Sequence, residues 1–456
     1  MVTILAMLPA AQTPAPVAIS SGDTAWVLMA SGLVLLMVPG LAFFYGGLVR
    51  DKSALNTMLM SLGALALVTV QWVLFGYSLA FGPGSSWIGS FVWAGMQGVT
   101  GTANATYAAA LPHILFAAFQ GMFAGITVAL FSGAVIDRMR FAAYLAFGLL
   151  WTTLVYDPLA HWVWGDGGWL RSLGALDFAG GTVVHISAGV TALVLAMVVG
   201  PRRAFGRTPT VPHNVPFALL GAGLLWFGWF GFNAGSALAA DGIAANALVT
   251  THTAAAAALI TWMAVEYFRT GRATAVGAAT GAVVGLVAIT PAAGFVTPLS
   301  AIAIGALAAP CSFFALQYRA KSRVDDTLDV FACHGIGGIV GALLTGVFAT
   351  KAVNPNGADG LLAGNATLLG VQFMAVVSTI AFAAIASFVI LRAMRLVMEL
   401  RIPVDAELAG IDVTEHGEEA YHGSDLSDLT GRTLSLGDAV AIAASDFEHT
   451  THRTVA

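Results

Sequence analysis

Two stretches of the chain combine a carboxylic acid and a histidine at the same spacing. Seven residues separate Asp177 from His185, and seven separate Asp326 from His334. Each stretch opens a long apolar segment, where an ionisable side chain is costly and marks a functional site by default. Imidazole donates and accepts hydrogen bonds and has a reference pKa of about 6.5, so two adjacent rings can pass a proton. The repeated spacing favours one shared centre formed by His185 and His334 over two separate structural histidines.

A metal site or hydrolytic catalysis fits these histidines less well. Zinc sites take three or four protein ligands, and the paired histidines supply only two. The two cysteines, Cys311 and Cys333, lie in apolar stretches and are too few for a disulfide framework. No nucleophile–base motif accompanies the histidines. We therefore expect no enzyme, no metal and no other cofactor.

The composition places this centre in a membrane protein. Of the 456 residues, 58% are hydrophobic and only 9% are charged, whereas a soluble domain carries about 25% charged residues. A membrane-spanning helix needs about 20 apolar residues. Eleven such runs lie near residues 24–47, 55–81, 108–135, 141–160, 178–199, 215–238, 245–267, 274–290, 296–318, 330–349 and 367–397. We therefore expect an all-α integral membrane protein with 11 transmembrane helices.

The basic residues predict which side of the membrane each loop faces, because cytoplasmic loops carry an excess of lysine and arginine. The odd-numbered loops contain twelve basic residues, namely Arg50, Lys52, Arg138, Arg140, Arg202, Arg203, Arg207, Arg269, Arg272, Arg319, Lys321 and Arg323. The even-numbered loops contain only Arg171 and Lys351. We therefore expect the odd loops and the C-terminus in the cytoplasm, and the N-terminus outside.

The predicted helices divide into two related halves. Five precede the loop at 200–214 and five more follow it, with one extra helix at the end. Because five is odd, the second half is inverted relative to the first. The Asp–His stretch opens the fifth helix of each half, and a polar site between inverted repeats is a common transporter plan. The transmembrane domain is expected at 22–399.

The two ends of the chain differ from this domain. Residues 1–21 contain a short apolar run followed by small residues, which is typical of a signal-peptide remnant but lacks the positive start of one. An extracellular N-terminal tail is the alternative. Residues 400–456 form an acidic cytoplasmic tail, in which a short helix is expected at 435–444. Its first part is expected to dock on the basic loops through exposed ion pairs, worth about 0–1 kcal/mol each.

Aromatic residues gather near the expected outer ends of several helices. They include Phe119, Phe123, Trp164, Trp229 and Phe232, with the hydroxyl of Ser236 nearby. Most aromatic residues of a membrane protein pack in its core or form an interfacial belt. Rings and a hydroxyl can also form an outward-open cage for a small cation, because aromatic faces attract cations.

With these motifs the chain resembles the ammonium transporter (Amt/Mep/Rh) family, and its bacterial Amt branch in particular. The resemblance covers roughly residues 22–422. Its motifs lie at 44–50, 119–123, 177–185, 229–236, 288–291, 325–334 and 410–421. Trp164 and Ser236 favour the Amt branch, because the Rh branch lacks this outer arrangement.

The resemblance implies a role for each candidate residue. The implied substrate-binding residues are Phe119, Phe123, Trp164, Trp229 and Ser236. The implied gate consists of Phe123 and Phe232, the twin histidines of the pore are His185 and His334, and the structural acids are Asp177 and Asp326.

The resemblance also implies the function of an ammonium transporter in the bacterial cytoplasmic membrane. NH4+ would bind at the outer site and lose its proton, and NH3 would cross the apolar pore while the histidines relay the proton for net NH4+ uptake. Two other functions stay open, a passive channel for NH3 or CO2 as in the Rh branch and an ammonium sensor. The implied partners are two further copies in a homotrimer and a cytoplasmic PII signal protein, and no nucleic acid is expected.

Overall fold

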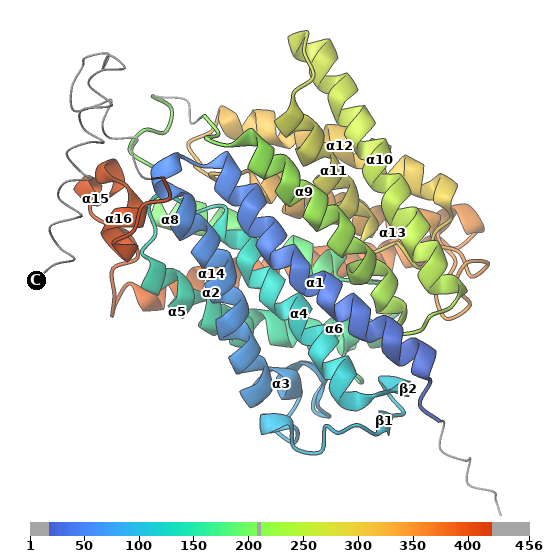
Figure 1. Ribbon diagram of the computed structural model, residues 1–456. Coiled ribbons are helices and arrows are strands. Elements are labelled where there is room, and N and C mark those ends of the chain that lie inside the picture. Colours follow the sequence, from blue (N-terminus) through green and yellow to red (C-terminus); the bar gives the residue numbers. More distant parts are fainter. Residues whose placement is uncertain (1–17, 208–210, 422–456) are drawn as a thin grey trace, which may run out of the picture.

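The computed structural model describes residues 18–207 and 211–421, which form a helical bundle with one small pair of strands (Figure 1). The strands β1 (Ala103–Asn104) and β2 (Ala108–Pro112) pair antiparallel. The predicted signal-peptide run before residue 18 and the predicted helix at 435–444 lie outside the described residues.

Helices occupy every stretch that the apolar runs predict. In the first half they are α1 (Ser21–Leu48), α2 (Ala54–Gln71), α3 (Tyr77–Phe81), α4 (His113–Ser132), α5 (Phe141–Trp151), α6 (Asp157–Trp164) and α8 (Ser187–Val199). In the second half they are α9 (Val215–Trp229), α10 (Gly242–Thr270), α11 (Ala275–Ile289), α12 (Pro298–Ala320), α13 (Gly337–Phe348) and α14 (Ala366–Met394). The shorter helices are α7 (Trp169–Leu173), α15 (Val404–Ala409), α16 (Ile411–His416) and the 3-10 turns η1 (Asp51–Ser53), η3 (Ala94–Met96), η7 (Gly235–Ala237) and η9 (Leu361–Ala363).

Wider, π-helical turns interrupt or begin several of these helices. They are η2 (Trp72–Gly76), η4 (Thr152–Tyr156), η5 (Gly181–Ile186), η6 (Phe230–Ala234) and η8 (Phe331–Ile336). A π turn inserts one extra residue into a helix and is frequent at functional sites. Three of these turns carry predicted site residues, because His185 lies in η5, Phe232 in η6 and His334 in η8.

Side chains cap several helix starts and satisfy N–H groups that have no partner within the helix. The Ser20 hydroxyl accepts a hydrogen bond from the backbone N–H of Asp23 at the start of α1. The Asp241 carboxylate accepts two such bonds at the start of α10, each 2.9 Å long. The C-terminal end of α11 is Ile289, two residues before Pro291.

Nine helical runs in the described part of the chain are long and apolar enough to cross a membrane. Large apolar side chains on their outer faces are exposed, such as Ile260, which is 66% exposed. A water-soluble monomer rarely carries apolar surface on this scale, but lipid chains cover it in a bilayer. The chain is therefore a multi-pass, all-α membrane protein.

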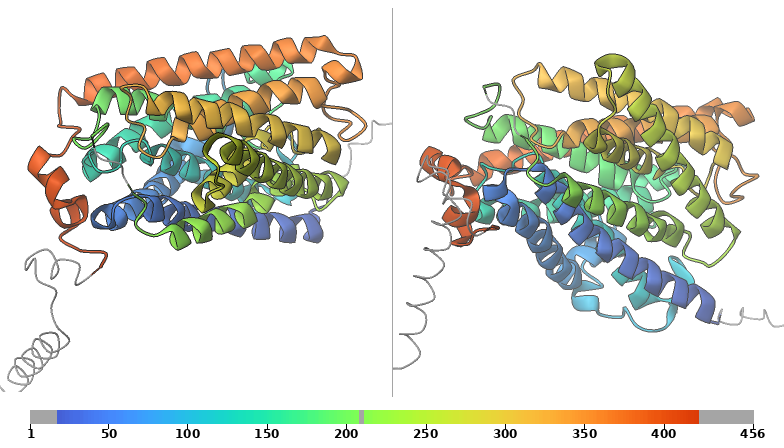
Figure 2. Two further views of the ribbon diagram at one scale, coloured as in Figure 1. Left: turned by 90° about the horizontal axis from the view of Figure 1, so that it is seen from above. Right: turned by 45° about the horizontal axis from the view of Figure 1, so that its top comes forward.

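The bundle has two distinct ends. α1 lies alongside α9, and α10 packs against α11 and α12 (Figure 1). β1 and β2 lie at one end of these helices, called here the strand end, and α15 and α16 lie at the opposite end, called the tail end (Figures 1 and 2).

Candidate substrate pathway

The two predicted histidines meet inside the bundle. The Nδ1 atoms of His185 and His334 are 3.3 Å apart, and the two rings are stacked with their centroids 5.4 Å apart. The side chains are buried, at 1% and 4% exposed. At this distance one Nδ1–H donates a hydrogen bond to the other Nδ1. The structure thus brings together two groups that lie 149 residues apart in the sequence.

A glycine contact sets the separation of the two π turns that carry the histidines. Gly189 of α8 lies against Gly335, which follows His334. A Cβ atom on Gly189 would lie only 2.2 Å from the backbone nitrogen of Gly335. No side chain fits this space, so glycine at 189 allows the backbones to approach and the histidine rings to meet.

Each predicted acid starts the π turn that carries its histidine. The Asp177 carboxylate accepts hydrogen bonds of 2.6–2.8 Å from the backbone N–H groups of residues 180–182. The Asp326 carboxylate accepts a bond of 2.8 Å from the N–H of Phe331. Carboxylates satisfy the free N–H groups at a helix start and are stabilised by its positive end. The same local design therefore occurs twice in the chain.

A cavity of about 250 Å³ lies at the strand end, next to the turn between β1 and β2. Three residues predicted for the binding site, Phe123, Trp164 and Ser236, line it. The indole N–H of Trp164 donates a hydrogen bond of 2.9 Å to the backbone oxygen of Asp177, which fixes the orientation of the ring. Sequence reasoning did not assign the other lining residues to the binding site. They are Phe81, Thr106, Tyr107, Phe116, Gln120, Val163, Arg171, Phe178 and Leu238.

Aromatic rings connect this cavity to the histidine pair. The ring of Trp164 lies 6.3 Å from that of Phe123, and Phe123 lies 4.2 Å from Phe232, measured between centroids. Phe232 in turn lies 6.0 Å from the ring of His185. Phe123 and Phe232 are buried at 1% and 0% exposed. Their contact therefore separates the strand-end cavity from the histidines.

Two further cavities continue the path beyond these rings. One of about 10 Å³ adjoins both His185 and His334, and its other lining residues are apolar or aromatic. It has room for about one water-sized molecule. The next cavity, of about 170 Å³, extends from His334 and includes the polar side chains of Tyr45, Thr327 and Asp329. A narrow apolar section therefore lies between two wider and more polar ones.

Two of the predicted binding residues lie away from the strand-end cavity. Phe119 packs edge-on against Phe123, with centroids 4.9 Å apart. Trp229 stacks on His185 at 5.4 Å and lines the narrow cavity. Its indole N–H donates a hydrogen bond of 2.9 Å to the hydroxyl of Thr290. Sequence reasoning did not assign Thr290 a role, although it lies in the motif at 288–291, directly before Pro291 at the end of an apolar run. This position was the sequence signal that could have identified Thr290 as a partner of the pathway.

Comparison with known proteins identifies the family. The family model described as Ammonium Transporter Family matches residues 25–421. The chain belongs to the ammonium transporter family. The resemblance inferred from the motifs is thereby confirmed, and the protein is an ammonium transporter and not an enzyme.

Individual relatives agree with this membership. The chain is 51% identical over 404 residues to the ammonium transporter of Bacillus subtilis, which covers 88% of this chain and 99% of that protein. It is 44% identical over 403 residues to ammonium transporter Amt1 of Archaeoglobus fulgidus, covering 88% and 100% of the two chains. The crystal structure of Candida albicans Mep2 matches with a TM-score of 0.81 and 38% identity, covering 89% of this chain and 92% of that one.

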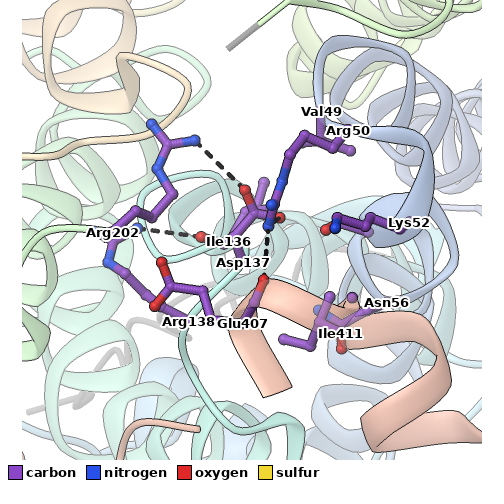
Figure 3. Close-up of polar contacts among 12 residues, drawn as sticks. Val49, Arg50, Lys52, Asn56, Ile136, Asp137, Arg138, Arg202, Glu407 and Ile411 are labelled. Atoms are coloured by element: carbon purple, nitrogen blue, oxygen red, sulfur yellow. Dashed lines mark hydrogen bonds and ion pairs between the residues drawn. The ribbon is translucent and has the colours of Figure 1, made fainter. Parts of the chain in front are cut away.

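At the tail end of this transporter, charged side chains from distant loops meet (Figure 3). Asp137, which follows α4, lies 3.2 Å from Arg50 and 3.5 Å from Arg202. Arg202 also lies 2.9 Å from the carboxylate of Asp325. Burial alone would raise the pKa of Asp325, but the guanidinium groups of Arg202 and Arg138 outweigh burial and hold that pKa below its usual range. The cluster joins the loops that follow α1, α4, α8 and α12.

The described part of the tail packs against these loops through buried acids. Asp412 of α16 is 1% exposed and accepts hydrogen bonds of 3.0 and 2.8 Å from the backbone N–H groups of Leu55 and Asn56, so it caps α2. Glu407 of α15 is 3% exposed and accepts a bond of 2.6 Å from the backbone N–H of Arg203. Basic side chains of the loop after α1 take part as well, since Arg50 and Lys52 donate hydrogen bonds to the backbone oxygens of Glu407 and Leu408. These bonds go to carbonyl groups, so the contact combines them with capped N–H groups and is not made of exposed ion pairs alone.

Proposed function

We propose that this transporter binds NH4+ in the strand-end cavity, removes its proton and conducts NH3 past the histidine pair to the tail end. The observation that carries the proposal is the contact between Phe123 and Phe232, with centroids 4.2 Å apart, which lies between the cavity and the histidines. In this mechanism Phe123, Trp164 and Ser236 hold the cation. Phe123 and Phe232 then form a gate that opens by rotation of their rings.

The cost of charge supports passage of the neutral molecule. Moving a bare ion of this kind into an apolar interior costs on the order of tens of kcal/mol, whereas a cation–π contact returns only about 2 kcal/mol. With the lysine reference pKa of about 10.4 as a stand-in, deprotonation near pH 7 costs roughly 4.6 kcal/mol. The narrow cavity of about 10 Å³, apolar apart from its histidines, therefore suits NH3 better than NH4+.

In this mechanism the proton travels through the histidine pair. The Nε2 atom of His185 is buried and has no hydrogen-bond partner in the described part of the chain. When the gate opens, this Nε2 atom can accept a proton from NH4+. The proton in the Nδ1–Nδ1 hydrogen bond then moves from His185 to His334, and His334 releases a proton from its own Nε2 atom. Reunion of NH3 and the proton at the tail end gives net uptake of NH4+ driven by the membrane potential.

Trp164→Leu is expected to weaken ammonium binding by about tenfold or more, because it removes an aromatic face worth about 2 kcal/mol to a desolvated cation. The test is competition between ammonium and methylammonium for uptake into proteoliposomes. Trp87→Leu is the matched control, because Trp87 lies at the same end and is 55% exposed. Unchanged competition in a folded Trp164→Leu protein would remove Trp164 from the binding site.

The proposal includes the topology and the domain limits. Eleven spans form an inverted 5+5 repeat with α14 as the extra helix, and residues 22–399 form the transmembrane domain between residues 1–21 and the tail at 400–456. The strand end and the N-terminus face outward, and the tail end and the C-terminus face the cytoplasm. The excess of basic residues in the loops at the tail end and the repeated Asp–His design support this arrangement.

We also propose that the protein resides in the bacterial cytoplasmic membrane as a homotrimer with one pore in each subunit. A cytoplasmic PII signal protein would close the pore from the tail end. Membership of the family supports these proposals. So does the packing of α15 and α16 beside the loops at the tail end, because it offers a partner an ordered surface.

Removal of residues 402–456 is expected to reduce transport or abolish inhibition by PII, with the trimer still assembled. This truncation deletes Glu407 and Asp412 and leaves the N–H groups at the start of α2 without their acceptor. Removal of residues 423–456 alone retains these contacts and is expected to leave transport almost unchanged. Methylammonium uptake with and without PII measures both effects. Normal, PII-sensitive transport by the shorter protein would show that the tail has no regulatory role.

A further inference from the structure

Both ring nitrogens of His161, in α6, face hydrogen-bond acceptors. Nδ1 lies 3.0 Å from the backbone oxygen of Ala80, and Nε2 lies 2.7 Å from that of Ser85. The side chain is 0% exposed. A carbonyl oxygen can only accept, so each nitrogen must carry a hydrogen to form both bonds. A neutral imidazole has one N–H group, and only the imidazolium cation has two.

The position of Ala80 favours such a cation. Ala80 lies in the last turn of α3, which ends a helical run from residue 54 to residue 81. The last carbonyl groups of a helix have no partner within it and carry partial negative charge, which stabilises a nearby cation. The neighbouring carbonyl groups already have donors, since Gly89 N–H binds the oxygen of Leu79 and the Tyr107 hydroxyl binds that of Phe81. His161 is the donor to the carbonyl group of Ala80.

No carboxylate neutralises this ring in the described residues. The ionisable residues on α6, in the loop that follows it and on the elements packed against it are Tyr77, Tyr156, Asp157, Asp166, Arg171 and His185. None of them forms a hydrogen bond or ion pair with His161, whose bonds are those to Ala80 and Ser85. The loop at 82–90 carries no ionisable residue at all. If the His161 ring lost one proton, one of the two carbonyl oxygens would therefore face the lone pair of an unprotonated ring nitrogen.

The contact joins α6 to the loop that follows α3. Three successive carbonyl groups of that loop accept hydrogen bonds from this region: those of residues 85, 86 and 87 bind His161 Nε2, the N–H of Trp169 and the indole N–H of Trp162, respectively. His161 also lies one helical turn before Trp164, the last residue of α6. The fit is close, because a Cβ atom on Gly165 would lie 2.6 Å from Nδ1 of His161.

We infer that His161 is a positioning residue, held as an imidazolium between the carbonyl oxygens of Ala80 and Ser85, and that it fixes the end of α6 and thereby the indole of Trp164. The effect on selectivity rests on the proposed function, in which Trp164 holds the substrate cation. The charge of His161 and its two hydrogen bonds do not depend on that proposal.

The charge is tested by 15N NMR of the full-length, [15N]histidine-labelled protein in lipid bilayers at about pH 7.5, where a free imidazole is mostly neutral. The His161 signals are those that disappear in His161→Gln and persist in His252→Gln, a control at an exposed histidine. We expect both His161 nitrogens to show the shifts of protonated atoms. A ring with only one protonated nitrogen would overturn the inference.

The positioning role is tested by competition between ammonium and methylammonium. We expect discrimination to fall about tenfold in His161→Leu, because this variant loses the two hydrogen bonds of a charged group. His161→Gln keeps an amide donor and is expected to recover part of the discrimination. His252→Leu should match the unmodified protein. Unchanged discrimination in either folded His161 variant would overturn the role, and so would an equal loss in His161→Gln and His161→Leu. If Trp164→Leu itself has no effect, the proposed binding site fails, and the NMR result still decides the charge of His161.

Discussion

His185→Ala is expected to give a folded protein whose ammonium current loses its selectivity over potassium or disappears. His185 is one half of the 3.3 Å histidine pair and lines the narrow cavity of about 10 Å³. In the proposed mechanism, alanine removes the atom that accepts the proton, and it also enlarges a passage whose small apolar section excludes ions. We expect the ratio of ammonium to potassium current to fall at least tenfold, which corresponds to about 1.4 kcal/mol.

The measurement is the current evoked by each ion in proteoliposomes that contain the variant. His252→Ala is the control, because His252 is exposed on α10 and lies outside the cavities of the pathway. A His185→Ala protein with the current and the selectivity of the unmodified protein would rule out the relay.

Arg138→Met is expected to have the largest effect on stability, about 3–5 kcal/mol, as for the loss of one partner from a buried charged network. Arg138 is 0% exposed. Its guanidinium donates hydrogen bonds of 2.7 Å to the backbone oxygen of Gly200 and to the hydroxyl of Thr327, and it also binds the backbone oxygen of Asp325. Burial lowers the pKa of Arg138 to about 10, so the side chain is still charged at neutral pH. Methionine fills the space but leaves these acceptors without donors.

Thermal unfolding of the purified protein, followed by tryptophan fluorescence, measures this effect. Arg140→Met is the matched control, because Arg140 pairs with the exposed Glu399 and such surface pairs contribute only about 0–1 kcal/mol. Equal unfolding temperatures for Arg138→Met and Arg140→Met would contradict the structural role of Arg138.

The stability of the same cluster is expected to depend on pH. The folded-state pKa of Asp325 lies below its usual value of about 3.9. The stability that this carboxylate contributes is therefore fully present above about pH 3.9 and is lost as the pH falls through the lowered folded-state pKa.

Much of the fold and of the pathway could be predicted from the sequence because the signals are local or repeated. Apolar runs of spanning length predicted the positions of the helices, since burial in lipid requires such runs. The equal spacing from Asp177 to His185 and from Asp326 to His334 predicted a shared centre. In the structure this spacing reflects a carboxylate that starts a π turn and a histidine near the end of that turn.

Other features could not be read from the sequence, because they depend on residues brought together by folding. The π turns leave no mark in hydropathy, which does not register one extra residue in a helical turn. The cluster of Asp137, Arg202 and Asp325 joins three loops that are distant in the chain. The tail was expected to dock through surface charge, yet Asp412 caps α2 with a buried carboxylate. The sequence assigned no role to His161, because its two acceptors lie 81 and 76 residues before it.

The most direct test of the proposed mechanism is the ammonium-evoked current of the purified, full-length protein in liposomes. Because the mechanism moves NH3 and a proton separately and reunites them, it predicts one net positive charge for each ammonium transported, with a smaller current for methylammonium and none for potassium. Ammonia uptake without any current would contradict this mechanism and would identify a passive channel for the neutral gas.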